Sequence, residues 1–251
     1  MPAVRYIFIK QKIFIEFKYL FSMEFEAIRN GHLECDKGFV TLGRDMGKII
    51  RIPVYCFLVK HPKGNVLIDT GFSVDFEKTW GKRLKFFKPI LEKDVVQHLK
   101  GTKISYIINT HLHIDHSENN PYFEGAEIIV QKEELEAATH PKPYQKFAYA
   151  DRIDEKLEYR IIDGNLDLFG DGCVKIMKTH GHTEGHQSVL LNLDGKKIFI
   201  AGDACYSSEN LKYNCLPGIL WNPDLIMENY SLIRNMKDTL IIFGHEEIES
   251  I

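Results

Sequence analysis

The sequence contains few cysteines, and their spacing excludes the cross-linked folds of small secreted proteins. There are five, an odd number, and no Cys-x-x-Cys pair is present. A chain of 251 residues can bury a sizeable core without disulfides or structural metals. We expect reduced, mostly buried thiols, as in a cytoplasmic protein, at Cys35, Cys56, Cys173, Cys205 and Cys215.

The sequence also lacks an excess of positive charge. The formal net charge is -3, and apolar and charged residues make up 44% and 27% of the chain, as in an ordinary globular protein. This balance of charges gives no excess of positive charge that would attract the phosphates of a nucleic acid. We therefore expect a small molecule as the partner, and the composition leaves a homodimer open.

No uninterrupted apolar run is long enough to cross a membrane. Residues 1–22 are rich in Ile and Phe, but four charged side chains interrupt them: Lys10, Lys12, Glu16 and Lys18. The segment also lacks the cleavage site of a signal peptide. We interpret residues 1–22 as an extension of uncertain role, such as an edge strand or an amphipathic surface anchor. Residues 23–251 are expected to form one domain without a membrane partner.

Short β-rich runs alternate with helical stretches along the chain, without a repeat or a flexible linker. The predicted strands are 52–59, 66–69, 104–109, 126–131, 174–179, 187–193, 197–201 and 240–243. The predicted helices are 86–99, 132–138 and 225–237, the last opened by Asn222 as N-cap with Pro223 at the first helical position. The alternation indicates an α/β domain with much sheet.

Polar residues follow three of these predicted strands. His111 follows the run 104–109, Asp203 follows 197–201, and His245 follows 240–243. In α/β proteins, loops at the carboxyl ends of strands assemble the functional site. This placement therefore favours one shared site.

Four possible metal ligands lie within six residues, at His111, His113, Asp115 and His116. In an extended backbone the first three would point to one side, and His116 would need a turn to join them. Imidazole and carboxylate suit zinc, iron or manganese better than copper(I). A second histidine-rich cluster follows at residues 180–186, so a chance group of surface histidines is the weaker interpretation.

Here the chain resembles the metallo-β-lactamase superfamily, whose HxHxDH motif is formed by these four residues. The later segments of the family follow in order as Gly181-His182-Thr183, Gly202-Asp203 and Gly244-His245. The resemblance covers nearly all of the chain from about Gly31 onward. It implies an α/β (α+β) fold of four layers, the αβ/βα sandwich, in which two sheets pack face to face with helices outside.

The resemblance also implies a site for two divalent metal ions, zinc first, with iron, manganese or cobalt as alternatives. One ion would be held by His111, His113 and His182, and the other by Asp115, His116 and His245. Asp203 would bridge them. A hydroxide between such ions could attack a substrate without a serine or cysteine nucleophile.

Three further polar residues near these motifs are interpreted separately. Asp69 is similar to the aspartate that orients a ligand histidine in the family, although a turn-forming Asp before Gly fits the sequence as well. His180 and His186 are not assigned to metal, because lone histidines of this kind are usually structural.

Several segments resemble the N-acyl-homoserine lactone lactonases, which are quorum-quenching hydrolases, more than other branches. They are 52–56, 128–132, 185–188 and 203–206. The tyrosine of those enzymes that matches Tyr206 lies beside the metals and hydrogen-bonds the substrate. Tyr206 would thus support the lactone carbonyl or the oxyanion, with a core tyrosine as the alternative. By the same analogy, Asp115 would protonate the leaving alkoxide as the ring opens.

An acyl chain needs an apolar channel, and the candidates are Trp80, Phe86 and Phe87, with core positions as the alternative. The chain departs from known lactonases nearby. Glu118 and Asn119 stand where many relatives have a Gly pair, and Ile114 replaces a frequent Phe. None of these differences changes a predicted metal ligand. They bear on which acyl chains, and whether lactones at all, are the preferred substrates.

Other members of the superfamily share the same ligands and remain as alternatives. A glyoxalase II-like thioesterase usually carries a C-terminal helical domain for glutathione, which we do not expect here. A hydrolase acting broadly on lactones or esters would need no sequence feature beyond the predicted metal ligands. A diiron redox enzyme typically has Glu at the position of His113.

Overall fold

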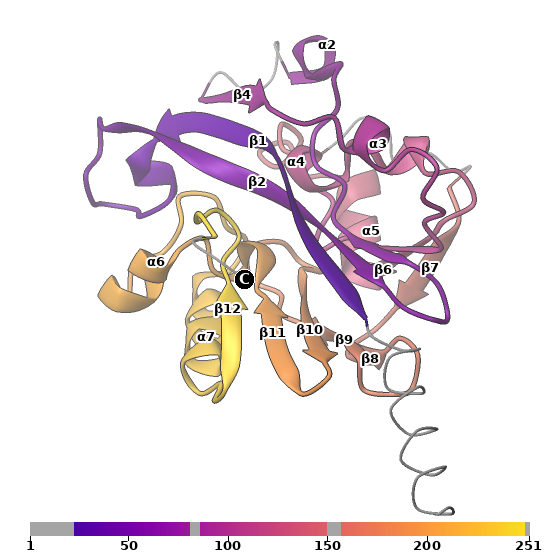
Figure 1. Ribbon diagram of the computed structural model, residues 1–251. Coiled ribbons are helices and arrows are strands. Elements are labelled where there is room, and N and C mark those ends of the chain that lie inside the picture. The colour runs from indigo at the N-terminus through magenta and orange to yellow at the C-terminus, as the bar shows by residue number, and fades with distance from the viewer. Residues whose placement is uncertain (1–22, 81–85, 150–156, 249–251) are drawn as a thin grey trace, which may run out of the picture.

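Two β-sheets face one another in the computed structural model, which describes residues 23–80, 86–149 and 157–248 (Figure 1). The first sheet has the order β4-β1-β2-β3-β5-β6-β7 and the second β12-β11-β10-β9-β8. The strands of the first sheet are β1 (Glu24–Asp36), β2 (Ile49–Lys60), β3 (Val66–Ile68), β4 (Phe87–Leu91), β5 (Tyr106–Ile108), β6 (Glu127–Gln131) and β7 (Tyr159–Ile162). Those of the second are β8 (Leu166–Asp167), β9 (Val174–Lys178), β10 (Gln187–Leu193), β11 (Lys196–Ile200) and β12 (Thr239–Ile242).

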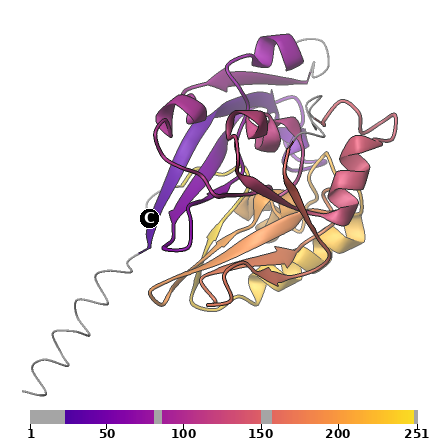
Figure 2. The same ribbon diagram turned by 90° about the vertical axis from the view of Figure 1, so that its right-hand side faces the viewer.

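Helices cover the outer faces of both sheets (Figures 1 and 2). The α-helices are α2 (Phe76–Trp80), α3 (Val95–His98), α4 (Ile114–Ser117), α5 (Lys132–Thr139), α6 (Ser208–Tyr213) and α7 (Pro223–Arg234). The described residues also form three 3-10 turns: η1 (Lys37–Phe39), η2 (Asn120–Tyr122) and η3 (Gly202–Ala204). Helices α3 and α5 pack on the first sheet, and α7 packs on the second. The predicted four-layer sandwich is therefore confirmed.

Strand β2 illustrates why the sheets lie inside the molecule. Eight consecutive residues of this strand are buried, because both of its faces are covered. Phe57 and Val59 point into the core between the sheets, whereas Cys56 and Leu58 pack under the helices. This alternation is the period of two that an extended backbone imposes.

All eight predicted strands are present, and so are the predicted helices at α5 and α7. Helix α7 begins as expected, because the Asn222 side chain accepts hydrogen bonds from the N–H groups of Asp224 and Leu225. It ends at Arg234, three residues before the expected end at Lys237. The extension 1–22 lies outside the described residues.

The predicted helix 86–99 is wrong. Its first part is β4, which pairs with β1 at the edge of the first sheet, and only Val95–His98 is helical. Pro89 explains the difference, because proline disrupts a helix interior but is tolerated in an edge strand. No helix in the described ranges is long and apolar enough to cross a membrane.

Candidate metal centre

The loop after β5 carries four of the predicted ligands. His113 is the N-cap of α4, which places Asp115 in its first turn and His116 in its last. The expected extended backbone through Asp115 is wrong, because the N–H groups of His116 and Ser117 both donate to the His113 carbonyl. The helical turn, rather than strand alternation, brings Asp115 and His116 toward the other ligands.

The remaining ligands come from loops of the second sheet. His182 follows β9, Asp203 lies in η3 after β11, and His245 follows β12. Strands β11 and β12 are parallel neighbours, so their carboxyl ends bring Asp203 and His245 together. All seven predicted ligands are at most 13% exposed.

The carboxylate of Asp203 lies between two groups of histidines. Its Oδ2 atom is 3.2 Å from His182 Nε2 and 3.8 Å from His111 Nε2. Its Oδ1 atom is 3.4 Å from the Nε2 atoms of both His116 and His245. One oxygen therefore faces each group, as a carboxylate bridging two ions requires.

The potential ligand atoms form three overlapping groups, and within each group they lie within 4.8 Å of one another. The groups are His111, His113 and His182; His111, His116 and Asp203; and Asp115, His116 and His245. His111 Nε2, His116 Nε2 and Asp203 Oδ1 are buried and have no hydrogen-bond partner among the described residues. Because orphaned buried polar atoms are costly, these residues fit bound cations.

The other ring nitrogens are already engaged. His182 Nδ1 lies 3.0 Å from the Ile219 carbonyl, and His245 Nδ1 lies 3.0 Å from the Pro53 carbonyl. Each Nδ1–H can donate to its carbonyl and so leave the Nε2 lone pair free for a metal. The backbone thus fixes the tautomer needed for ligation.

The Asp69 carboxylate orients the His116 ring as the backbone carbonyls orient His182 and His245. Asp69 Oδ2 is 2.7 Å from His116 Nδ1, and its two oxygens also accept from the N–H and hydroxyl of Thr110. Asp69 has a φ of 54°, a left-handed conformation that is uncommon outside glycine. Hydrogen bonds on both oxygens hold the residue in this conformation and orient the imidazole.

Burial and charge together set the protonation of the ligands. Burial lowers the pKa of His113 and His182 to about 3, which favours the neutral imidazoles that a metal ion would need. Burial opposes charge on His116 as well, but Asp115, Asp203 and Asp69 raise its pKa well above the usual value. The same three carboxylates would favour a bound cation at this position, as they favour positive charge on His116.

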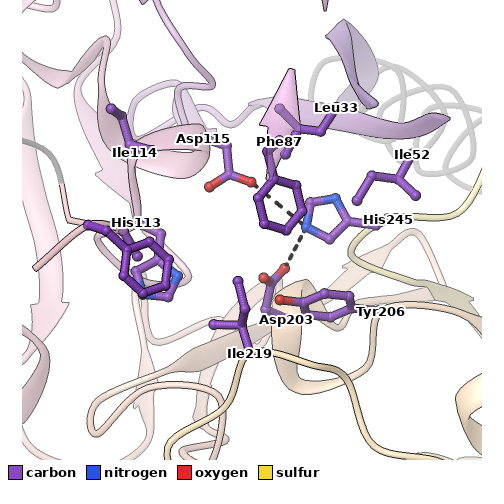
Figure 3. Close-up of a pocket in the computed structure, with 12 residues that line it drawn as sticks. Leu33, Ile52, Phe87, His113, Ile114, Asp115, Asp203, Tyr206, Ile219 and His245 are labelled. Atoms are coloured by element: carbon purple, nitrogen blue, oxygen red, sulfur yellow. Dashed lines mark ion pairs between the residues drawn. The ribbon is translucent and has the colours of Figure 1, made fainter. Parts of the chain in front are cut away.

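A pocket opens over this cluster (Figure 3). Its polar lining consists of His113, Asp115, Asp203, Tyr206 and His245, and its apolar lining includes Leu33, Ile52, Phe87, Ile114 and Ile219. The Tyr206 hydroxyl points toward Asp203 (Figure 3). Burial and the nearby Asp203 and Asp115 raise the pKa of Tyr206, so its hydroxyl stays a donor.

The three channel candidates differ in position. Phe87 lines the pocket and packs against Phe39, with ring centroids 4.9 Å apart. Phe86 is 66% exposed and is not among the lining residues. The side chain of Trp80 lies outside the described part of the chain. A second pocket of ≈ 200 Å³ shares His113 and Ile219 with the first.

Glu118 and Asn119 attach the segment after Asp69 to the ligand loop. The Glu118 carboxylate accepts from Ser73 N–H at 2.8 Å and from the Thr79 hydroxyl. Asn119 Nδ2 donates to the Thr70 carbonyl at 2.8 Å. The segment that leads toward β4 is therefore bound to the turn that carries Asp115 and His116.

His186, which the sequence analysis interpreted as structural and did not assign to metal, is buried, and its Nε2 accepts from the Asp203 N–H at 2.9 Å. It therefore holds the backbone of Asp203 in place. The role of Glu134 was not identified from the sequence. Glu134 is buried at the start of α5 and contacts two ligand loops. The sequence offered one sign of this role, because Glu134 lies on the face of a short amphipathic helix that is expected to be buried. His180 belongs to none of the candidate ion groups of the described residues.

Comparison with known proteins adds to this geometry. The sequence pattern of the metallo-beta-lactamase superfamily matches residues 49–245. The N-acyl homoserine lactonase AttM of Rhizobium radiobacter is 28% identical over 240 residues, which is 87% of this chain and 91% of AttM.

Solved structures of lactonases are similar over almost the same length. A variant of Bacillus thuringiensis AiiA with N-decanoyl-L-homoserine at its active site has a TM-score of 0.78 and 29% identity, covering 90% of this chain and 93% of AiiA. An N-acyl homoserine lactone hydrolase with N-hexanoyl-L-homoserine bound at its catalytic metal centre gives the same values.

Proposed function

Because this chain belongs to the metallo-beta-lactamase superfamily, we propose that it is a dinuclear metal-dependent hydrolase that opens the lactone ring of N-acyl homoserine lactones. The main support is Asp203, whose two oxygens each face a separate group of histidines at the base of a pocket. The lactonase relatives, similar over about nine-tenths of the chain, support the substrate class.

Two ions fit the ligands described above, and zinc suits such a set of imidazoles and carboxylates. His111, His113 and His182 would hold one, Asp115, His116 and His245 the other, with Asp203 shared. Bound there, they would supply an activated water at neutral pH and polarise the carbonyl of the substrate.

The protein side chains supply the remaining chemistry. Tyr206 is a buried O–H donor beside Asp203, where it can hydrogen-bond the lactone carbonyl and the charge that develops on its oxygen. Asp115 lines the same pocket and is the most exposed of the seven ligands, at 13%. It can therefore take up the proton that the attacking water loses and deliver it to the alkoxide released when the ring opens.

The pocket also has an apolar wall. Leu33, Ile52 and Phe87 form one side of it, and Ile114 lies beside Asp115. An acyl chain on this wall would bury apolar surface and position the ring over the ligands. Phe87 is our candidate for a channel residue.

A substrate panel tests the proposed function. Opening a neutral lactone produces a carboxylic acid, so a pH indicator follows the reaction directly. We expect N-acyl homoserine lactones of several chain lengths to be hydrolysed faster than simple lactones, thioesters, β-lactams and phosphodiesters. Rapid cleavage of thioesters or phosphodiesters without any lactone opening would overturn the lactonase assignment and leave a hydrolase of another specificity.

A further inference from the structure

Glu134 is a buried carboxylate that takes no part in the chemistry proposed above. It projects from the first turn of α5 and is 1% exposed. Its Oε1 atom accepts from Leu112 N–H at 2.8 Å. Its Oε2 atom accepts from the Thr183 hydroxyl at 2.5 Å and from Gly185 N–H at 3.2 Å.

These donors belong to the two loops that carry one complete set of histidines. Leu112 lies between His111 and His113 in the loop after β5, and Thr183 directly follows His182 in the loop after β9. The two loops belong to different sheets. Glu134 therefore joins the sheets beside the three-histidine position. The segment after β5 also carries Asp115 and His116, but these lie within α4, and none of the hydrogen bonds of Glu134 reaches that helix or the loops of Asp203 and His245.

The packing of Gly185 supports the same connection independently. A Cβ atom at Gly185 would lie 2.2 Å from the Glu134 backbone nitrogen and 2.6 Å from the Glu134 Cβ. Only glycine permits this approach of the loop to the helix. The loop after β9 is thus fixed against α5 by backbone contact as well as by the carboxylate.

We propose that Glu134 is a positioning residue that holds His111, His113 and His182 in the geometry of one metal position. The proposal rests on the proposed function for the identity of the ligands. Three donors converge on Glu134, so it must accept on both oxygens. A glutamine would present an NH₂ group to at least one backbone N–H and lose that bond.

Burial raises the pKa of Glu134 to about 7, although the three donors oppose this shift. The three donors thus offset part of the cost of burying this carboxylate, and losing any of them would leave it less well compensated.

The test compares Glu134→Gln with Glu133→Gln as the matched control. Glu133 is the neighbouring residue, and its carboxylate pairs with Lys178 Nζ at the end of β9, at 2.6 Å, instead of accepting from a residue of either ligand loop. Zinc content is measured by mass spectrometry at buffered free zinc, and anomalous scattering from crystals identifies the depleted position. We expect Glu134→Gln to weaken zinc binding roughly 10- to 100-fold at the three-histidine position alone. Glu133→Gln should match the wild type.

Urea unfolding of the metal-free proteins separates positioning from folding. Selective loss of zinc by a Glu134→Gln protein that remains folded supports the proposal. Wild-type affinity at both positions, or equal loss at both, would overturn it. If the wild type holds one ion only, at the three-histidine position, the dinuclear function fails while the effect of Glu134 remains measurable. If the wild type binds no ion, both proposals fail.

Discussion

At the scale of single residues, Tyr206 is the side chain that most directly distinguishes lactone chemistry from generic metal binding. We predict that Tyr206→Phe lowers kcat/KM for acyl homoserine lactones by roughly ten- to a thousandfold, or about 1.4–4 kcal/mol, because one donor to the oxyanion is lost. Both ions should stay bound, since the hydroxyl is not a ligand in the proposed site. Steady-state kinetics and metal analysis check this, and unchanged kcat/KM would assign Tyr206 to the core.

Asp203 offers a second test at this scale. In Asp203→Asn an amide nitrogen replaces one of the two oxygens that face the histidine groups, so we expect metal content to fall from two ions toward one, with a parallel loss of activity. Asp194→Asn is the control, because Asp194 lies in a turn with φ 52°, which asparagine tolerates. Two tightly bound ions in Asp203→Asn would contradict a bridging role.

One shared site was predictable at this scale from short local patterns, namely the spacing of His111 to His116 and the positions of Asp203 and His245 after predicted strands. The addition of His182 and the division into two groups of ligands came from the resemblance to the superfamily, and the assignment of these residues to metal stays a prediction. The contacts of Glu134 were not predictable, since its partners Leu112 and Thr183 lie 22 and 49 residues away and meet it only in the folded chain.

At the scale of elements, interior strands were predicted better than edge strands. Strand β2 is a continuous apolar run because both of its faces are buried. The edge strands β4, β7 and β8 were not predicted. Strand β1 lies in the interior of the first sheet, and it was missed because its register shifts between Arg29 and Gly31, a bulge that breaks the alternation of side chains. The apolar residues of β4 imitate a helical pattern, and only Pro89 argued against it.

The contact between the β2–β3 and β8–β9 turns predicts a dependence of stability on pH. The His61 ring stacks on Phe169 with centroids 3.9 Å apart, and its Nε2 lies 3.1 Å from Asp171 Oδ2. His61, Asp171 and Cys173 are close enough to hold an ion. However, His61 Nδ1 accepts from Lys63 N–H, so Nε2 carries the proton and offers no lone pair.

Burial lowers the pKa of His61 below its usual 6.5, despite the neighbouring Asp171. Neutral His61 therefore contributes fully to the free energy of unfolding above pH 6.5, the usual pKa of histidine. This contribution is lost as the pH falls through the lowered pKa of the folded state. We predict that the unfolding free energy of the wild type, minus that of His61→Phe, decreases as the pH is lowered from about 8 to about 5. Urea unfolding measures it, and a difference that does not vary with pH would contradict this assignment.

At the scale of the whole molecule, metal removal should lower stability. The ligands come from both sheets, so ions that bind only the folded chain stabilise it by mass action. We predict that a chelator lowers the Tm and that added zinc restores it, as followed by calorimetry. Equal Tm values with and without zinc would show that the cluster is stable without ions.

The position of β12 at the edge of the second sheet has a kinetic consequence. Among the strands that the structure describes, β12 has one neighbour, and such an edge strand opens more readily than interior strands such as β5 and β9. Opening of β12 would withdraw His245 but leave the three-histidine set in place. The two ions should then exchange at different rates, and isotopically labelled zinc would enter one position long before the other. The ion at the three-histidine position would then stay bound from the time of folding. The occupancy of the position that includes His245 would instead change with the concentration of free metal around the protein.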